Sequence, residues 1–338
     1  MALLLVGCSA EQEAYDGGQQ KGLMPVLFSA GNVNRALTRA SASYMPAGSH
    51  FRCAMFFHAG SSDNNASPFY SKANPLDEDV NMAVANLEIT DAYGQAAYQP
   101  ESSTFYWQNR LEHVYLALAD NHHQADVPQT QVGGDVSFDL TNSEYKSMTD
   151  QPDPIMALTK QAPAGATAEA NRVNLYFKHL FAQVQVNVKG SQNESAQIES
   201  TQIVGVELLG VTPQATVTFG ITSEGQNIAP TFVPTGEDAP FQMFDRNTVA
   251  TGYLKSFECI AFGKLQGIRI TWKESAVDDA IQHVTTFKGV KDLTLESGKK
   301  YIYNLELRRS LIAQVSASIT PWGMDETNYS ADGTITDY

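Results

Sequence analysis

Residues 174–189, NLYFKHLFAQVQVNVK, lie just past the middle of the 338-residue chain and decide its fold class. From Leu180 onward two sets alternate, one apolar (Leu180, Ala182, Val184, Val186, Val188) and one mainly polar (Phe181, Gln183, Gln185, Asn187, Lys189). Successive side chains of a β-strand point to opposite faces of a sheet, so this period predicts a half-buried antiparallel strand. We interpret it as the opening strand of a second β-domain.

Short strand patterns recur on both sides of this stretch. Before it they fall at residues 24–29, 50–59, 84–90, 113–119 and 134–140, and after it at 203–209, 215–219, 257–262, 267–272, 301–307 and 311–319. Such regular spacing, with turn residues between the strands, is typical of β-sandwiches, and no segment has a convincing long helical pattern. A loop rich in Pro, Ala and Gly at 150–166 separates the two halves. The sequence therefore predicts an all-β chain with one domain at 23–165 and another at 166–338.

The overall composition limits the classes of partner that the protein is expected to bind. The formal net charge is -15. Nucleic acid and anionic membrane surfaces both attract basic proteins, so the charge disfavours these partners. No apolar run approaches the length of a membrane-spanning helix.

Cysteine is scarce, since the chain holds only Cys8, Cys53 and Cys259. Three cysteines do not make a disulfide framework. Cys53 and Cys259 lie in apolar, strand-like runs, where free cysteines are commonly buried. We expect two buried free thiols, with a bridge between them as the alternative.

The N-terminus, MALLLVGCSAEQEAYDGGQQKG, is similar to a bacterial lipobox. An apolar run ends in Gly7-Cys8, and residues 9–22 form a polar stretch that we interpret as a flexible tether. The similarity predicts lipidation of Cys8, which tethers a protein to a membrane without spanning it. The match is partial, because no Lys or Arg precedes the run and the run is short. A chance match, or a true start upstream of Met1, are the alternatives. Residues 1–22 are thus expected to be a truncated lipoprotein signal and tether.

Patterns that mark catalysis are absent from the sequence: there is no GxSxG, HExxH, Walker or GxGxxG motif. Neighbouring strand residues face opposite ways, so the adjacent pair His122 and His123 is a poor metal chelate. The acidic or polar clusters at 63–65 and 278–279 lack EF-hand spacing and are expected to be solvated turns. We expect no enzyme, no cofactor and no metal. The aromatic run 105–107 is expected to pack in a sheet, with stacking on sugar rings as the alternative if it is exposed.

Several landmarks together resemble the fimbrillin-like lipoproteins of Bacteroidetes, which are subunits of type V pili. They are FKHLFAQV at 177–184, LESGKKYIYN at 295–304, ITPW at 319–322, VLF at 26–28 with LTRA at 37–40, and YW at 106–107 followed by the apolar run 114–120. The Cys8 lipobox also fits. Each motif alone is weak. Their order and spacing over nearly the whole chain carry the resemblance.

The resemblance implies two transthyretin-like β-sandwich domains and export as a lipoprotein to the outer membrane. It also implies that a trypsin-like, Arg-specific protease cuts after an arginine and removes the first strand. A strand from another subunit then fills the vacated groove, which gives a head-to-tail polymer. Carried onto this chain, the cut falls after Arg39, with Arg35 as the nearby alternative. The residues alone favour solvated charges at both positions.

By this resemblance the lost strand is about residues 24–38, and the donor strand lies within about 311–338. The resemblance does not distinguish a stalk subunit from a tip, accessory or anchor subunit. The competing hypothesis is a monomeric cell-surface lipoprotein that binds a glycan or a host protein. It predicts an exposed aromatic platform and no strand exchange.

Overall fold

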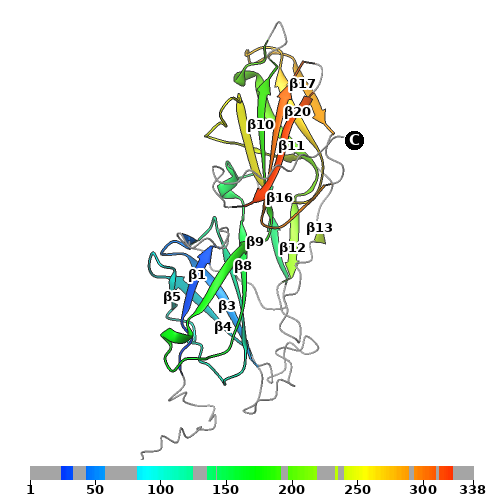
Figure 1. The fold of residues 1–338 in the computed structure, drawn as a ribbon. Helices are drawn as coiled ribbons and strands as arrows, with labels where there is room; N and C mark the ends of the chain where they lie inside the picture. The colour runs from blue at the N-terminus through cyan, green and yellow to red at the C-terminus, as the bar shows by residue number, and fades with distance from the viewer. Residues whose placement is uncertain are drawn as a thin grey trace, which may run out of the picture.

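The computed structural model describes residues 24–32, 43–57, 82–124, 135–141, 143–191, 197–218, 233–234, 240–288, 293–309 and 312–322. Within these ranges the chain is all-β apart from three single 3-10 turns, Met148–Asp150, Glu169–Asn171 and Ser200–Gln202. The predicted fold class is therefore confirmed. None of the helices in the described ranges has the length and apolar character needed to cross a bilayer. Figure 1 shows an elongated molecule with β1, β3, β4 and β5 at one end and β10, β17 and β20 at the other.

The first sheet closes on itself. Its strands are β1 (Phe28–Asn32), β2 (Ser43–Tyr44), β3 (His50–Phe57), β4 (Met82–Ile89), β5 (Gln95–Tyr98), β6 (His113–Asp120), β8 (Pro154–Gln161) and β9 (Val173–His179). The order is β2-β1-β5-β4-β3-β6-β8-β9, and an additional pairing of β1 with β9 completes the ring. Inside the ring lies a core of alternating strand residues such as Phe51, Leu87 and Leu175.

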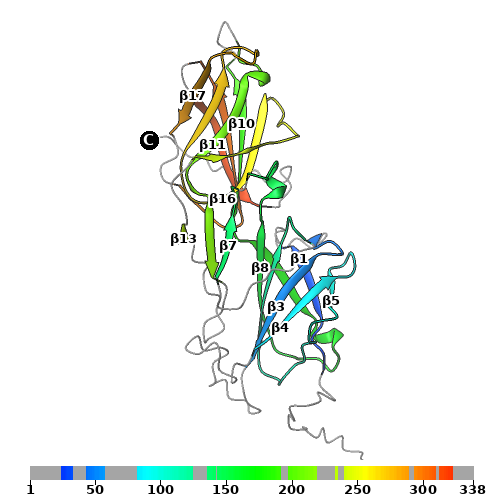
Figure 2. The same ribbon diagram turned by 180° about the vertical axis from the view of Figure 1, so that it is seen from behind.

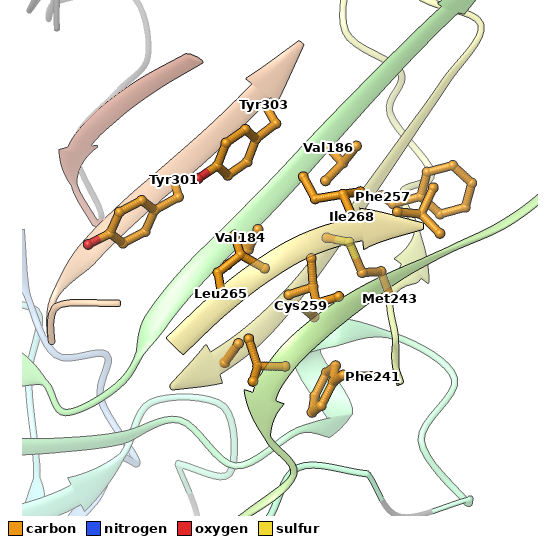
Figure 3. Close-up of a cluster of buried hydrophobic side chains, with 14 of the residues drawn as sticks. Val184, Val186, Phe241, Met243, Phe257, Cys259, Leu265, Ile268, Tyr301 and Tyr303 are labelled. Atoms are coloured by element: carbon orange, nitrogen blue, oxygen red, sulfur yellow. The ribbon is translucent and has the colours of Figure 1, made fainter. Parts of the chain in front are cut away.

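The second sheet is built around one long strand. Its members are β10 (Ala182–Gly190), β11 (Ile203–Thr212), β14 (Phe241–Gln242), β15 (Phe244–Asp245), β16 (Lys255–Lys273), β17 (Gln282–Phe287), β18 (Leu293–Leu295), β19 (Lys299–Leu307) and β20 (Ile312–Pro321). The first part of β16 pairs with β10 and β15, and the last part pairs with β11, β17 and β18. At the change of partners Gly263 has φ +96°, a conformation that favours glycine. The single strand thus serves both layers, whose side chains meet in the core of Figure 3.

A small third sheet joins segments from both halves of the sequence. It consists of β7 (Asp135–Asp139), β12 (Gln214–Thr218) and β13 (Val233–Pro234). The partner of β7 is β12, in antiparallel register from Asp139↔Gln214 to Asp135↔Thr218. Figure 2 shows β7 and β12 running together between the two larger sheets.

The stretch 174–189 is two strands and not one. β9 pairs with β1 and β8 of the first sheet, whereas β10 pairs with β16 and β19 of the second. Between them Leu180 donates its N–H to the Pro154 carbonyl, and Phe181 accepts from Gly298. The buried apolar positions move from odd-numbered residues in β9 (Val173, Leu175, Phe177) to even-numbered residues in β10 (Val184, Val186, Val188). This change of phase marks the junction, but it does not say which strands the new segment pairs with.

The loop expected at 150–166 contains a strand. β8 begins at Pro154 and pairs with β6 along its whole length, from Pro154↔Asp120 to Gln161↔His113. Proline is tolerated as the first residue of a strand because no ladder hydrogen bond is lost there. The Pro residues therefore made this strand look like a loop in the sequence. A domain boundary after residue 165 would separate β9 from the first sheet, to which β9 belongs.

Cys53 and Cys259 are both free and fully buried, which confirms the thiol interpretation. They lie in different cores, Cys53 inside the ring of the first sheet and Cys259 in the core of the second. Burial raises the pKa of both thiols, since the interior does not solvate a thiolate.

In a Cys8→Ser variant we expect the native protein to show no reaction with the thiol reagent DTNB, and two thiols to react after denaturation. The free energy of unfolding should stay constant at pH values below the ordinary thiol pKa of about 8.5. It should decrease at higher pH, because there the thiols ionise only in the unfolded chain. Thiol titration and urea melts at several pH values measure both effects. A disulfide would instead leave the denatured, unreduced chain unreactive.

Candidate functional site: the seat of strand β1

The segment 24–32 closes the first sheet and is held along both edges. On one edge β1 runs parallel to β9 over its whole length, from Phe28↔Val173 to Asn32↔Phe177. On the other edge it is antiparallel to β5 and then to β2. We call the surroundings of this segment the seat. Within the stretch 24–38 expected to be the first strand, the structure has β1 at Phe28–Asn32 and an isolated bridge at Pro25, and residues 33–38 lie outside the described ranges.

The inward face of the segment is apolar and fully buried. Val26, Phe28 and Ala30 are each 0% exposed. The Phe28 ring makes edge contacts with the rings of Tyr98, Phe105 and Tyr115, at centroid distances of 6.2, 6.1 and 5.4 Å. Aromatic pairs of this geometry add to the free energy gained by burying the rings. Phe28 is therefore the main anchor of the strand.

Hydrogen bonds hold the backbone of the segment outside the regular ladder. The pairs are Val26 N–H to Phe105 O (2.9 Å), Tyr98 Oη to Val26 O (2.8 Å), Val173 N–H to Leu27 O (2.8 Å), Arg172 Nη1 to Phe28 O (2.9 Å), Ala30 N–H to Gly94 O (2.8 Å) and Met45 N–H to Ala30 O (3.2 Å). Removing the segment would leave these groups, and the free edges of β9 and β5, without partners.

Gly94 lies against the seat with φ +72°, and a Cβ there would collide with the Ala30 carbonyl oxygen. We expect Gly94→Ala to lower the free energy of unfolding by about 2 kcal/mol, through the left-handed backbone and the displacement of β1. Gly48 is the matched control, since it has φ +85° and a Cβ at this position would meet no atom within 4 Å. Gly48→Ala should cost about 1 kcal/mol, from the backbone alone. Equal losses in chemical denaturation would argue against a contact with β1.

The outward face over β1 carries exposed tyrosines. Gly31 is the register partner of Tyr176 on β9 and of Tyr44 on β2, so all three positions point to the same side. Tyr44 and Tyr176 are 38% and 56% exposed. We call them the tyrosine face. It depends on β1, because Gly31 lies between its two members.

The three processing residues predicted from the sequence lie outside the described ranges: Cys8, Arg35 and Arg39. The two arginines fall in the segment 33–42, which joins β1 to β2. On its C-terminal side β1 is linked to the rest of the chain only through this segment. A cut there would leave β1 held by packing and hydrogen bonds alone.

The donor region expected at 311–338 contains β20. This strand pairs with β19 and ends the path of the second sheet. At its end the Trp322 ring stacks on His179 of β9 at 3.8 Å, and His179 Nδ1 lies 2.8 Å from the buried Asp153 carboxylate. His179 therefore packs at the junction between the two large sheets. Its contact with Trp322 joins residues far apart in the sequence, so no local pattern signalled it.

The other candidate positions serve structure. Phe105 and Trp107 are 1% and 4% exposed, so the aromatic run 105–107 packs under β1, as expected. Among the described residues no group of three His, Cys, Asp or Glu side chains could hold a metal ion. His122 and His123 face Asp153 and Asp120, respectively.

The site therefore defines a class of protein: an all-β chain with a buried first strand that one short segment connects to the rest. The sequence profile of the fimbrillin-like family matches residues 38–322, and the chain belongs to that family. A search of curated protein sequences gives no match.

Two solved structures with TM-scores above 0.5 share the fold. A proposed cell adhesion protein from Bacteroides uniformis has a TM-score of 0.55 at 13% identity, covering 90% of this chain and 99% of its own. One from Bacteroides ovatus has a TM-score of 0.53 at 14% identity, covering 90% and 100%. The tip fimbrial protein Mfa3 from Porphyromonas gingivalis, with a C-terminal truncation, has a TM-score of 0.46 at 11% identity, covering 88% and 99%.

Proposed function

We propose that this protein is a subunit, or a tip or accessory adhesin, of a type V pilus at the cell surface, assembled by donor-strand exchange. The observation that carries the proposal is the position of β1: it completes a ring of strands and is linked onward only through 33–42. Family membership, and the names of two structural relatives as cell adhesion proteins, support the same role.

In the proposed assembly, lipidation of Cys8 tethers the exported chain to the outer membrane. A trypsin-like, Arg-specific protease then cuts after Arg39 or Arg35. The cut detaches the tether and β1 together from the body. The empty seat offers the edges of β9 and β5 and an apolar slot, which a strand from a second copy fills. The donor comes from 311–338, and repetition of this contact gives a head-to-tail filament.

We also propose that the chain folds as two transthyretin-like domains, one around each large sheet. The strand pairings support a change from one domain to the other at Leu180 and Phe181, since β9 pairs with β1 and β10 pairs with β16. The role requires no cofactor and no catalytic residue.

The test is limited trypsin digestion of the unlipidated chain, followed by intact mass and by light scattering. We expect one cut after Arg39 or Arg35 and then oligomers, or capture of an added peptide of residues 311–338. Arg35→Ala, Arg39→Ala and the double variant locate the cut. A clean cut that leaves a monomer unable to bind the peptide would overturn strand exchange.

A second candidate function is the binding of a glycan or a host protein by a monomer. The tyrosine face supports it, since tyrosine rings are frequent anchors at binding surfaces. The test is a glycan array with the intact chain and with a Tyr44→Ala/Tyr176→Ala variant. Binding that the variant loses would support this candidate, and absence of binding to any glycan would count against glycan recognition.

A further inference from the structure

Two polar atoms are buried beneath β1 without a hydrogen-bond partner. They are the hydroxyl of Tyr115, whose side chain is 0% exposed, and the indole N–H of Trp107, which is 4% exposed. The two rings are in edge contact, with centroids 5.8 Å apart, and Phe28 of β1 packs on Tyr115 at 5.4 Å. Buried polar groups in folded proteins nearly always have a partner, so each exception calls for a reason.

The neighbouring polar groups of the seat are paired. The Tyr98 hydroxyl donates to the Val26 carbonyl at 2.8 Å. The Gln108 N–H lies 3.2 Å from His113 Nε2. Only Tyr115 and Trp107 lack partners, among the described side chains that line the seat. The reason lies in the segment 24–32, whose inward residues Val26, Phe28 and Ala30 carry no polar side-chain atom.

We infer that the seat is built for a different strand, one with a hydroxyl-bearing side chain at an inward position that reaches Tyr115 or Trp107. The inference rests on the proposed function and names what the incoming strand of a second copy carries. The chain's own β1 fills the apolar slot but leaves the two polar atoms unpaired. An incoming strand that pairs them binds more tightly and therefore displaces β1.

The first test uses the intact, uncut chain and needs neither cleavage nor assembly. Tyr115→Phe keeps the ring and removes the unpaired hydroxyl, so the folded state should become about fivefold more populated relative to the unfolded state, or more. Tyr98→Phe removes a paired hydroxyl from the same seat, so it should shift the equilibrium in the opposite direction. An unfolding equilibrium for Tyr115→Phe equal to wild type, or shifted toward unfolding, overturns the inference.

Tyr303→Phe is the second control. Its hydroxyl is also buried and unpaired, but it lies in the core of the second sheet. It should stabilise the fold without changing the rate at which the cut chain releases β1, whereas Tyr115→Phe should slow that release. A release rate that Tyr115→Phe leaves unchanged also overturns the inference.

The second test measures peptides of residues 24–32 in competition for the seat of the cut chain. Three variants place one hydroxyl at an inward position: Val26→Thr, Phe28→Tyr and Ala30→Ser. At least one should bind about tenfold more tightly than the native peptide, and that gain should vanish on a Tyr115→Phe or Trp107→Phe body. Burying a hydroxyl normally weakens packing. If all three variants bind more weakly than the native peptide, the inference fails. A third outcome separates this inference from the proposed function. If the cut chain binds no peptide at all but Tyr115→Phe still stabilises the uncut chain, strand exchange is refuted, while the energetic cost of the unpaired Tyr115 hydroxyl is confirmed.

Discussion

Replacing Phe28 with alanine is expected to lower the free energy of unfolding by about 3–5 kcal/mol. The side chain is fully buried and contacts the rings of Tyr98, Phe105 and Tyr115. Truncation removes these contacts and leaves a cavity under a strand of only five residues. In the uncut chain, chemical denaturation measures the loss.

After a cut in 33–42 the same substitution should weaken retention of the β1 segment by up to about 10²- to 10³·⁵-fold, since each 1.4 kcal/mol is a factor of ten. The release of the fragment can be followed by size-exclusion chromatography and mass. Phe56→Ala is the matched control, because Phe56 is also 0% exposed but lies in a separate cluster of the first sheet, with Ala54, Val114 and Leu116. It should destabilise the fold without comparable loss of the fragment. Equal release from both variants would show that Phe28 is not a specific anchor.

Replacing Gln151 with leucine is expected to lower the free energy of unfolding by about 3–4 kcal/mol. The Gln151 side chain is 0% exposed. Its Oε1 accepts from the Ile260 N–H at 2.7 Å, and its Nε2 donates to the carbonyls of Ile260 (3.3 Å) and Leu140 (2.8 Å). The Gln151 amide thus hydrogen-bonds to the backbone of β16 in the way that a neighbouring strand would. Leucine has a similar volume, so the loss isolates the buried backbone groups left without partners.

Gln185→Leu is the matched control for this prediction. Gln185 is 1% exposed, and its Oε1 has no hydrogen-bond partner, while its Nε2 donates to Asn187 Oδ1 at 3.0 Å. The substitution removes one unpaired polar atom and one hydrogen bond whose acceptor keeps the Ser256 hydroxyl as a donor, so the change should stay within about 1 kcal/mol in either direction. Urea denaturation of both variants gives the comparison. If the two substitutions cost the same, the hydrogen bonds of Gln151 contribute little to stability.

The two-residue period of apolar side chains was enough to predict an all-β fold. The alternation at 182–188 corresponds to β10, and the pattern at 301–307 to β19. The first strand was also visible, since Val26, Phe28 and Ala30 are the inward residues of the seat. These features are local, because a strand with one buried face must repeat every second residue.

The same pattern did not show which strands pair with one another. The two strands expected at 257–262 and 267–272 are one strand, β16, which changes partners near Gly263. β8 was concealed by its flanking prolines, and Gln151 appeared to belong to a loop. None of these residues has an unusual local sequence. Their roles depend on segments distant in the sequence, as in the pairing of Pro154 with Asp120 and the hydrogen bond of Gln151 with Ile260.

By itself the sequence determined that the chain is all-β, where most strands lie and which family its ordered motifs resemble. Only the tertiary structure decided that 174–189 divides between two sheets, that β1 closes a ring, and that Tyr115 and Trp107 are buried beneath it without partners. The physical reason is that periodicity reports which side of a strand is buried. The identity of the neighbouring strand is set by long-range pairing and packing, which leave no periodic trace in the sequence.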